Sequence, residues 1–285
     1  MSAAKKAATA SLQRDAELMR LARAFGVDQS ELAFLDGADE TALRQLRLSV
    51  TDRLFAISAN GMTAPAALAS KVPAALSATL AEKALGPVLS ARMVPHVDTK
   101  AIPGIAQRLS AEFLADSAVH LDLRHAAPLI SAIPQDKLEQ AGAVLAEREE
   151  FVVLAAFVGY LDVSVLRGLL SVFDAETLLQ AAFLVEQPDR IDALLSHLDD
   201  NRLDELLQAA RTSDLWVEAL SMFTELGVRQ QTRFVSAFHR LGPEALAEVA
   251  DEMAGNKALA AAAKPLLKLL NPATRKRVTA KLARA

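Results

Sequence analysis

The five histidines are the first residues to test for chemistry, because imidazole acts as an acid, a base or a metal ligand near neutral pH. No two of them stand four residues apart, the spacing that turns two imidazoles toward one zinc ion on a helix. His120 and His125 flank a predicted turn, so their imidazoles can approach each other in space. We interpret the histidines as polar helix-end residues in preference to a metal or catalytic site. They are His96, His120, His125, His197 and His239.

Two acidic clusters are dense enough to hold a divalent cation together with water molecules. A structural interpretation competes with this one. Glu149 and Glu150 can start the helix that follows them, where the helix dipole favours negative charge, and Asp199 can cap another. We favour the structural interpretation and predict no metal site. The clusters comprise Glu147, Glu149 and Glu150, and Asp199, Asp200, Asp204 and Glu205.

The usual signatures of catalysis are missing from the sequence. It contains no cysteine, which excludes disulfides, Cys-ligated zinc, iron–sulfur clusters and thiol nucleophiles and is consistent with a reducing compartment. It also lacks a G-x-S-x-G elbow, a phosphate-binding glycine loop and a dinucleotide fingerprint. We therefore predict neither an enzyme nor a cofactor.

The composition predicts an all-α protein. Hydrophobic residues make up 52% of the 285 residues and aromatic residues only 5%, with alanine and leucine carrying the hydrophobic share. Apolar residues recur with the period of a helix almost throughout, and Leu43, Leu46, Val50 and Leu54 form one such stripe. Breaks such as Asn60-Gly61 predict helices of about 10–15 residues joined by short turns.

A helix-start pattern recurs between residues 97 and 250. Each copy has an apolar residue, a capping or turn residue, three variable positions, an apolar residue, two variable positions and two apolar or small residues. Two pairs of copies with an internal spacing of 12 residues lie 40 residues apart, a length typical of helix-pair solenoids. We favour a solenoid over the alternative, an irregular helical bundle. The copies begin at Val97, Leu121, Ile133, Leu161, Phe173, Leu198, Leu226 and Leu241.

Three stretches of this pattern, SAIPQDKLEQAGAVL, LSVFDAETLLQAAFLV and SHLDDNRLDELLQAA, carry a resemblance to known families. They resemble the cytoplasmic N-terminal superhelical domain of MgtE-type magnesium transporters and the related armadillo-like middle region of the flagellar motor switch protein FliG. The resemblance covers at most residues 97–250, and this sequence has no transmembrane helix and no nucleotide-sensing domain. It implies a right-handed helical superhelix of short antiparallel helices, without transport or motor function. In the transporter domain, carboxylates such as those of the two clusters hold magnesium.

The chain divides into four predicted segments. They are a flexible leader (1–11), an N-terminal helical region (12–92), a helical-repeat domain (93–255) and basic C-terminal capping helices (256–285). In the second segment we predict helices at Leu12–Phe25, Gln29–Leu35 and Glu40–Ile57, followed by a linker or a loosely packed helical hairpin over 58–78.

The segment Phe151–Leu161 is the longest apolar run, and it has about half of the roughly 20 residues that a membrane-spanning helix needs. We therefore expect a soluble, cytoplasmic protein. Because this helix is apolar on every face, it should be central and wrapped by its neighbours. The surrounding side chains line either a filled core, which we favour, or a cavity for a lipid-like ligand with a few polar groups. The apolar lining would be Met93, Phe157, Phe173 and Phe183, and the polar groups Tyr160, Arg167, Arg124 and His120.

Charge is distributed unevenly along the chain. The net charge is −4, but Met253–Ala285 contains eight basic residues and no acidic one, which leaves −12 for the rest. The candidate contact residues Arg275, Lys276, Arg277 and Lys281 lie in this tail. Peripheral contact with an anionic membrane and binding to an acidic protein surface are open alternatives, whereas the absence of aromatic residues disfavours nucleic acid. We favour a capping helix with a solvated basic face.

Two functional hypotheses follow. The first is a non-enzymatic helical-repeat protein that binds a protein partner through its groove or an exposed face. The alternative is a carrier of a hydrophobic small molecule in a cavity around residues 151–183. An enzyme of unfamiliar geometry is the third, less favoured, hypothesis.

Overall fold

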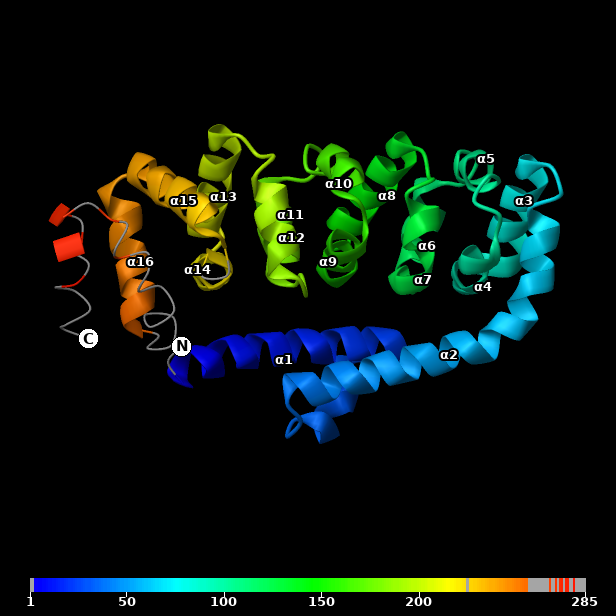
Figure 1. Cartoon of the computed structure of the whole chain (residues 1–285), viewed down its shortest axis with the longest axis horizontal. Helices are drawn as coiled ribbons and strands as arrows, with labels where there is room; N and C mark the ends of the chain where they lie inside the picture. The colour runs from blue at the N-terminus through cyan, green and yellow to red at the C-terminus, as the bar shows by residue number, and fades with distance from the viewer. Residues whose placement is uncertain are drawn as a thin grey trace. The chain divides into compact units, whose positions relative to one another are not determined.

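Every regular element in the described part of the chain is a helix (Figure 1), so the all-α prediction is confirmed. The computed structural model describes residues 3–223 and 226–255 and, beyond them, residues 267, 270, 272–273, 275–276 and 279. Within these ranges the side chains of residues 3–13, 58–60, 188, 217–218, 221, 252 and 254–255 are not described. No helix in the described residues is both long enough and apolar enough to cross a membrane.

Residue contacts divide the chain into two compact units. The N-terminal unit comprises Arg14–Phe173, and the C-terminal unit comprises Asp174–Ala285 together with Met1–Gln13. The first half of the chain contains α1 (Ala3–Phe25), the 3₁₀ helix η1 (Gln29–Leu35), α2 (Glu40–Ala69), α3 (Ala74–Leu80), the π-helical η2 (Ala81–Leu85), α4 (Gly86–Met93), the 3₁₀ turn η3 (Val94–His96), α5 (Ile102–Ala106), α6 (Ala111–Ala118), α7 (Leu123–Ile130), α8 (Gln135–Glu147), α9 (Phe151–Tyr160) and α10 (Val163–Leu169). The second half contains α11 (Ala175–Phe183), α12 (Pro188–Leu195), α13 (Asp200–Thr212), α14 (Trp216–Phe223), α15 (Val228–Leu241) and α16 (Pro243–Gly255).

Local capping chemistry explains where many of these helices begin. Asp174 and Asp199 are N-caps whose carboxylates accept hydrogen bonds from backbone N–H groups three residues on, both at 2.8 Å. Asp122 caps α7 in a similar way. The predicted helix starts at these positions are confirmed. The copy that begins at Val97 is wrong in detail, because Asp98 caps only a turn and α5 starts at Ile102, just before a proline suited to a first helical turn.

The N-terminal helices differ from the prediction at two places, the start of α1 and the end of α2. α1 begins at Ala3 and not at Leu12, because alanine and lysine favour helix. The helix predicted at Gln29–Leu35 is confirmed as η1. The predicted end of the next helix at Ile57 is wrong: α2 continues through Asn60-Gly61 to Ala69, and α3 follows, so 58–78 is largely helical.

Within each unit, many helices pack on the helix two places along the chain. In the N-terminal unit, α4 contacts α6, α6 contacts α8, α8 contacts α10 and α7 contacts α9 (Figure 1). In the C-terminal unit, α11 contacts α13, α13 contacts α15 and α14 contacts α16. Phe223, Phe234 and Phe238 lie at the centre of the C-terminal unit, each at most 1% exposed. Several helices have only five to nine residues, shorter than expected, because turns interrupt them early.

Two glycines lie where α8 approaches α10 and the residues that follow it. A Cβ added to Gly142 would lie 3.0 Å from Cζ of Phe173, and one added to Gly168 would lie 2.0 Å from Nε2 of Gln135. The Phe173 ring would have to shift by a few tenths of an ångström, whereas the end of the flexible Gln135 side chain can move aside, so Gly142 is the more constrained of the two positions.

The apolar helix α9 is covered by its neighbours to different extents along its faces. It packs against α7 and α8 and buries Val153, Leu154 and Ala155, while its other side chains are half-buried. No residue of α9 is exposed, so the prediction that its neighbours cover it is confirmed in part: three residues are buried and the others are half-buried. An apolar sequence sets no preferred face, so the neighbouring helices decide which residues are covered.

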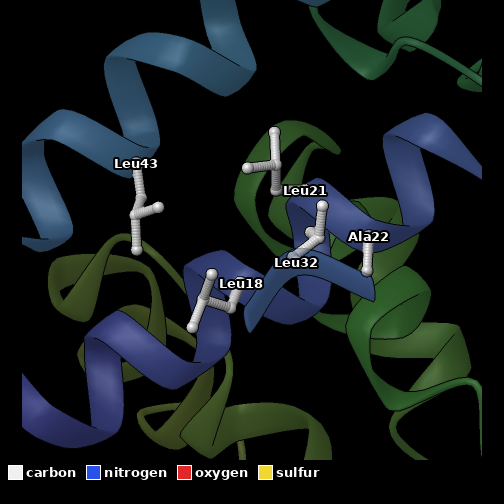
Figure 2. Packing of buried hydrophobic residues seen from close by; sticks show 5 residues of the cluster. All are labelled: Leu18, Leu21, Ala22, Leu32 and Leu43. Carbon is white, nitrogen blue, oxygen red and sulfur yellow. The ribbon is translucent and has the colours of Figure 1, made fainter. Parts of the chain in front are cut away.

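The start of α2 is covered by α1 and η1. Figure 2 shows Leu43 of α2 beside Leu18, Leu21 and Ala22 of α1 and Leu32 of η1, which form one buried cluster. Leu43 is only 1% exposed. The cluster fixes the first turns of α2 against α1.

Candidate functional site

Arg124 joins α7 to the middle of α2. Its Nη2 donates a hydrogen bond of 2.6 Å to Oγ1 of Thr51, and its Nη1 lies 2.7 Å from the Asp52 carboxylate. Nη2 and Nε also donate to the carboxylate of Asp122, at 2.7 and 3.0 Å. Tyr160 at the end of α9 lies within electrostatic range of the guanidinium. Two predicted polar groups of the cavity, Arg124 and Tyr160, are therefore near each other.

The pKa values of this network favour its charged form. Burial by itself raises the pKa of Asp122, but the hydrogen bonds and charge of Arg124, together with His125, outweigh burial and hold this pKa below its usual range. The hydrogen bond to Asp122 in turn raises the pKa of Arg124 against the effect of burial. The Asp122–Arg124 pair therefore stays ionised over the whole physiological pH range.

An aromatic stack adjoins this network. The Phe55 ring on α2 stacks on the His125 imidazole with ring centroids 3.8 Å apart and on His96 with centroids 5.6 Å apart. Nδ1 of His125 lies 3.2 Å from Oδ2 of Asp122, within ion-pair range but without hydrogen-bond geometry. Nε2 of His96 is buried with no hydrogen-bond partner among the described residues. Stack and network together fasten α2 to η3 and α7.

A second charged cluster joins α1 to α2. Glu17 on α1 is fully buried, and its carboxylate lies 2.8 Å from Arg20, 3.2 Å from Arg44 and 2.9 Å from Arg47. Burial raises the pKa of Glu17, but the hydrogen bond from Arg47 and the charges of the three arginines outweigh burial and lower it. A buried carboxylate held in this way is a structural clamp.

The remaining predicted cavity residues are spread over the molecule. Phe157 and Phe173 are half-buried, Arg167 and His120 are exposed, and Phe183 belongs to the C-terminal unit. Partial desolvation, with the charges of Arg23 and Arg92, lowers the pKa of the exposed His120. Met93 is buried at the end of α4. The ligand cavity stays a prediction.

Ion pairs and caps occupy several of the carboxylates in the two acidic clusters. Glu150, which precedes α9 without a side-chain capping hydrogen bond, pairs with Arg23, and Glu205 pairs with Arg202. The other pairs and caps join Asp200 to Arg233, Asp204 to Arg240, and Asp199 to the backbone N–H of Arg202. Across the described residues, no group of three or more histidine and carboxylate side chains is arranged to hold a metal ion.

The basic tail is described only in part. Arg275 donates from Nε to the carbonyl of Leu267, at 2.8 Å, and from Nη2 to that of Leu270, at 3.0 Å. Lys276 is exposed. Arg277 and Lys281 lie outside the described residues. A binding role for the tail stays a prediction.

Exposed apolar side chains gather in the stretch from α2 to α4. Ile57 is 64% exposed and Leu68 is 62% exposed, unusually high values for large apolar residues in helices. In residues 109–173 of the same unit, Val172 is the only described large apolar side chain that is exposed. We call the following seven residues the apolar surface: Leu54, Ile57, Leu68, Leu76, Leu80, Val88 and Leu89.

The predicted apolar stripe of α2 is covered only at its start. Leu43 is buried, but Leu46 and Leu54 are exposed. The reason is that α1 and η1 cover only the first turns of α2. The sequence signal was present, since apolar residues continue at helical spacing from Leu43 to Leu68.

Thr51, Phe55 and Glu17 had no signal of their own in the sequence, because their partners lie far along the chain.

The molecule belongs to the class of all-α proteins built by packing sequential helices. Comparison of the chain with family models, curated proteins and solved structures found no match.

Proposed function

We propose that this chain is a non-enzymatic helical-repeat protein that binds a protein partner through an exposed face. The observation that carries the proposal is the apolar surface. Contiguous exposed apolar side chains are unfavourable in water and mark interaction sites. The elements that bear them contact one another: α2 contacts α4, and η2 contacts both α3 and α4.

The proposed architecture is a right-handed superhelix of short antiparallel helices. Packing of helices on the helix two places along is what such a fold requires. Contacts at a regular sequence distance also support it in the N-terminal unit: Lys137 to the Leu109 carbonyl spans 28 residues, and Gln135 to the Val165 carbonyl spans 30. An extended helical array offers a long face to a partner.

Affinity capture with matched variants tests the function. The intact chain, the variant Ile57→Ser/Leu68→Ser and the control Val172→Ser/Val228→Ser are immobilised, and proteins retained from a lysate of the native host are quantified by mass spectrometry. All four positions are exposed valine, leucine or isoleucine, so each variant should keep its fold.

We expect the same protein to be enriched by the intact chain and by the control and lost from the Ile57→Ser/Leu68→Ser variant. If no retained protein distinguishes this variant from the control, the proposal fails. Circular dichroism of all three proteins confirms that a loss of binding does not come from unfolding.

A further inference from the structure

The apolar surface continues an interface that the chain already uses. Leu43, Leu54, Ile57 and Leu68 fall on one face of α2 by helical spacing. α1 covers this face at Leu43 (Figure 2), whereas the three later residues are exposed. The apolar face of α2 is thus half covered by a helix and half open.

The covering helix shows what kind of segment suits α2. α1 brings leucines against the apolar face and also a carboxylate, Glu17, which meets Arg44 and Arg47 of α2. An apolar stripe flanked by an acidic residue is therefore complementary to the start of α2.

The stretch that carries the apolar surface is positively charged, like Arg44 and Arg47 at the start of α2. Residues 53–108 contain six basic and two acidic residues, a net charge of +4, whereas residues 109–173 contain four basic and nine acidic residues, a net of −5. Glu82 and Asp98 each accept a hydrogen bond from a backbone N–H. The six basic residues are all exposed, and none forms an ion pair with another described residue: Arg53, Lys71, Lys83, Arg92, Lys100 and Arg108.

We propose that the apolar surface and the exposed basic residues of the same stretch, 53–108, bind an acidic amphipathic helix of a partner protein, which lies along α2 beyond the point that α1 covers. The proposal rests on the protein-binding function proposed above and specifies its surface and its partner. Leucine-like side chains of the partner pack on Leu54, Ile57 and Leu68. Its carboxylates pair with the unpaired basic residues, of which Arg53 and Lys83 lie one helical turn from Ile57 and Leu80.

A synthetic peptide tests this directly with the full chain. The probe is a fluorescein-labelled helix of about three heptads with leucine at positions a and d and glutamate at e and g, where repulsion between glutamates disfavours pairing of the peptide with itself. Two peptides serve as comparisons, one with lysine in place of glutamate and one with the acidic sequence scrambled to destroy the stripe. Fluorescence anisotropy gives the dissociation constants.

We expect the acidic peptide to bind at least about tenfold more tightly than either comparison peptide. The variant Ile57→Ser/Leu68→Ser should weaken binding about tenfold, and so should Arg53→Glu/Lys83→Glu, whereas Val172→Ser should leave it unchanged. Binding to the wild type should weaken as salt is added, and the Arg53→Glu/Lys83→Glu variant should lose most of that dependence.

Three results with the peptides would overturn the proposal: no binding of the acidic peptide, equal binding of the lysine peptide, or binding that Ile57→Ser/Leu68→Ser leaves intact. The full chain is also mixed with vesicles of phosphatidylglycerol and phosphatidylcholine. Binding to these vesicles alone would overturn the proposal too, because it would assign the surface to a membrane. If affinity capture still yields a protein lost from Ile57→Ser/Leu68→Ser, the protein-binding function stands and only the acidic-helix partner is rejected.

Discussion

Arg124 and Thr51 are 73 residues apart in the chain, yet Nη2 of the arginine donates a 2.6 Å hydrogen bond to the threonine hydroxyl. The same hydroxyl donates to the carbonyl of Arg47, one turn back in α2. These hydrogen bonds join the middle of α2 to α7. The stack of Phe55 on His125 lies one turn further along α2.

Replacing Arg124 with alanine should lower the free energy of unfolding by about 1.5–3 kcal/mol, because hydrogen bonds from a charged donor to Thr51 and Asp122 are lost. The pair with Asp52 adds little, since that carboxylate is 60% exposed. Urea unfolding of the full chain measures the change. Arg167→Ala is the matched control, exposed and expected to change stability by at most about 0.5 kcal/mol. Equal losses for both would contradict the role of Arg124.

Replacing Glu17 with glutamine should cost about 3–5 kcal/mol, because three arginines are left around a buried site without their counter-charge. Glu112→Gln, at an exposed position, provides the comparison and should have a small effect. A cost for Glu17→Gln no larger than that of Glu112→Gln would show that the cluster is not a clamp.

The pH dependence of stability follows from the same residue. The pKa of Glu17 is lower in the folded chain than in the unfolded chain, so its contribution is present above the ordinary carboxyl value of about 4.3 and is lost as the pH falls toward the folded-state value. Wild-type stability should therefore fall more steeply below about pH 5 than that of Glu17→Gln. Parallel urea titrations across this pH range decide the point. Asp122 contributes with the same sign, so some acid sensitivity remains in the variant.

Two glycine substitutions should have opposite effects. Gly61 lies inside α2 with no atom within 4 Å of an added Cβ, so Gly61→Ala should raise stability by about 1 kcal/mol through helix propensity. Gly86 also has free space but adopts φ +72°, so Gly86→Ala should lower stability by about 1–2 kcal/mol. Thermal unfolding of both variants measures this contrast. A destabilising Gly61→Ala would mean that α2 is interrupted at Asn60-Gly61.

Arg233 is expected to stabilise the C-terminal unit in the way that Arg124 stabilises the N-terminal unit. From α15 it donates to the carbonyls of Leu195 and Leu198, at 2.9 and 2.6 Å, and to the carboxylate of Asp200, at 3.0 Å. Arg233→Ala should cost about 1.5–3 kcal/mol, and Arg233→Lys should restore only part of it, because an ammonium lacks the planar fork. Arg229→Ala, exposed on the same helix, is the control. Full recovery by lysine would show that charge alone matters.

Helix starts were the most predictable feature of the fold. Asp174 and Asp199 act on N–H groups three residues away, so the capping signal lies within one turn of chain. The end of α2 was mispredicted because two local signals conflict there. Asn60-Gly61 normally breaks a helix, but the alanine-rich sequence after it sustains the helix to Ala69.

The candidate binding surface was predictable only in part. The apolar stripe of α2 can be read from its spacing, and so can the excess of basic residues in 53–108. Whether the stripe is covered depends on where α1 and η1 end against it, and no local signal contains that information.

Helical character, most helix starts and the distribution of charge can be read from the amino-acid sequence, because propensity, capping and charge act over a few residues. The tertiary structure alone decided that Glu17 is buried among three arginines, that Phe55 meets His125 and that Ile57 and Leu68 face solvent. Each of these depends on contacts between segments far apart in the chain, and such contacts are settled when helices pack against one another, after their local patterns have been satisfied.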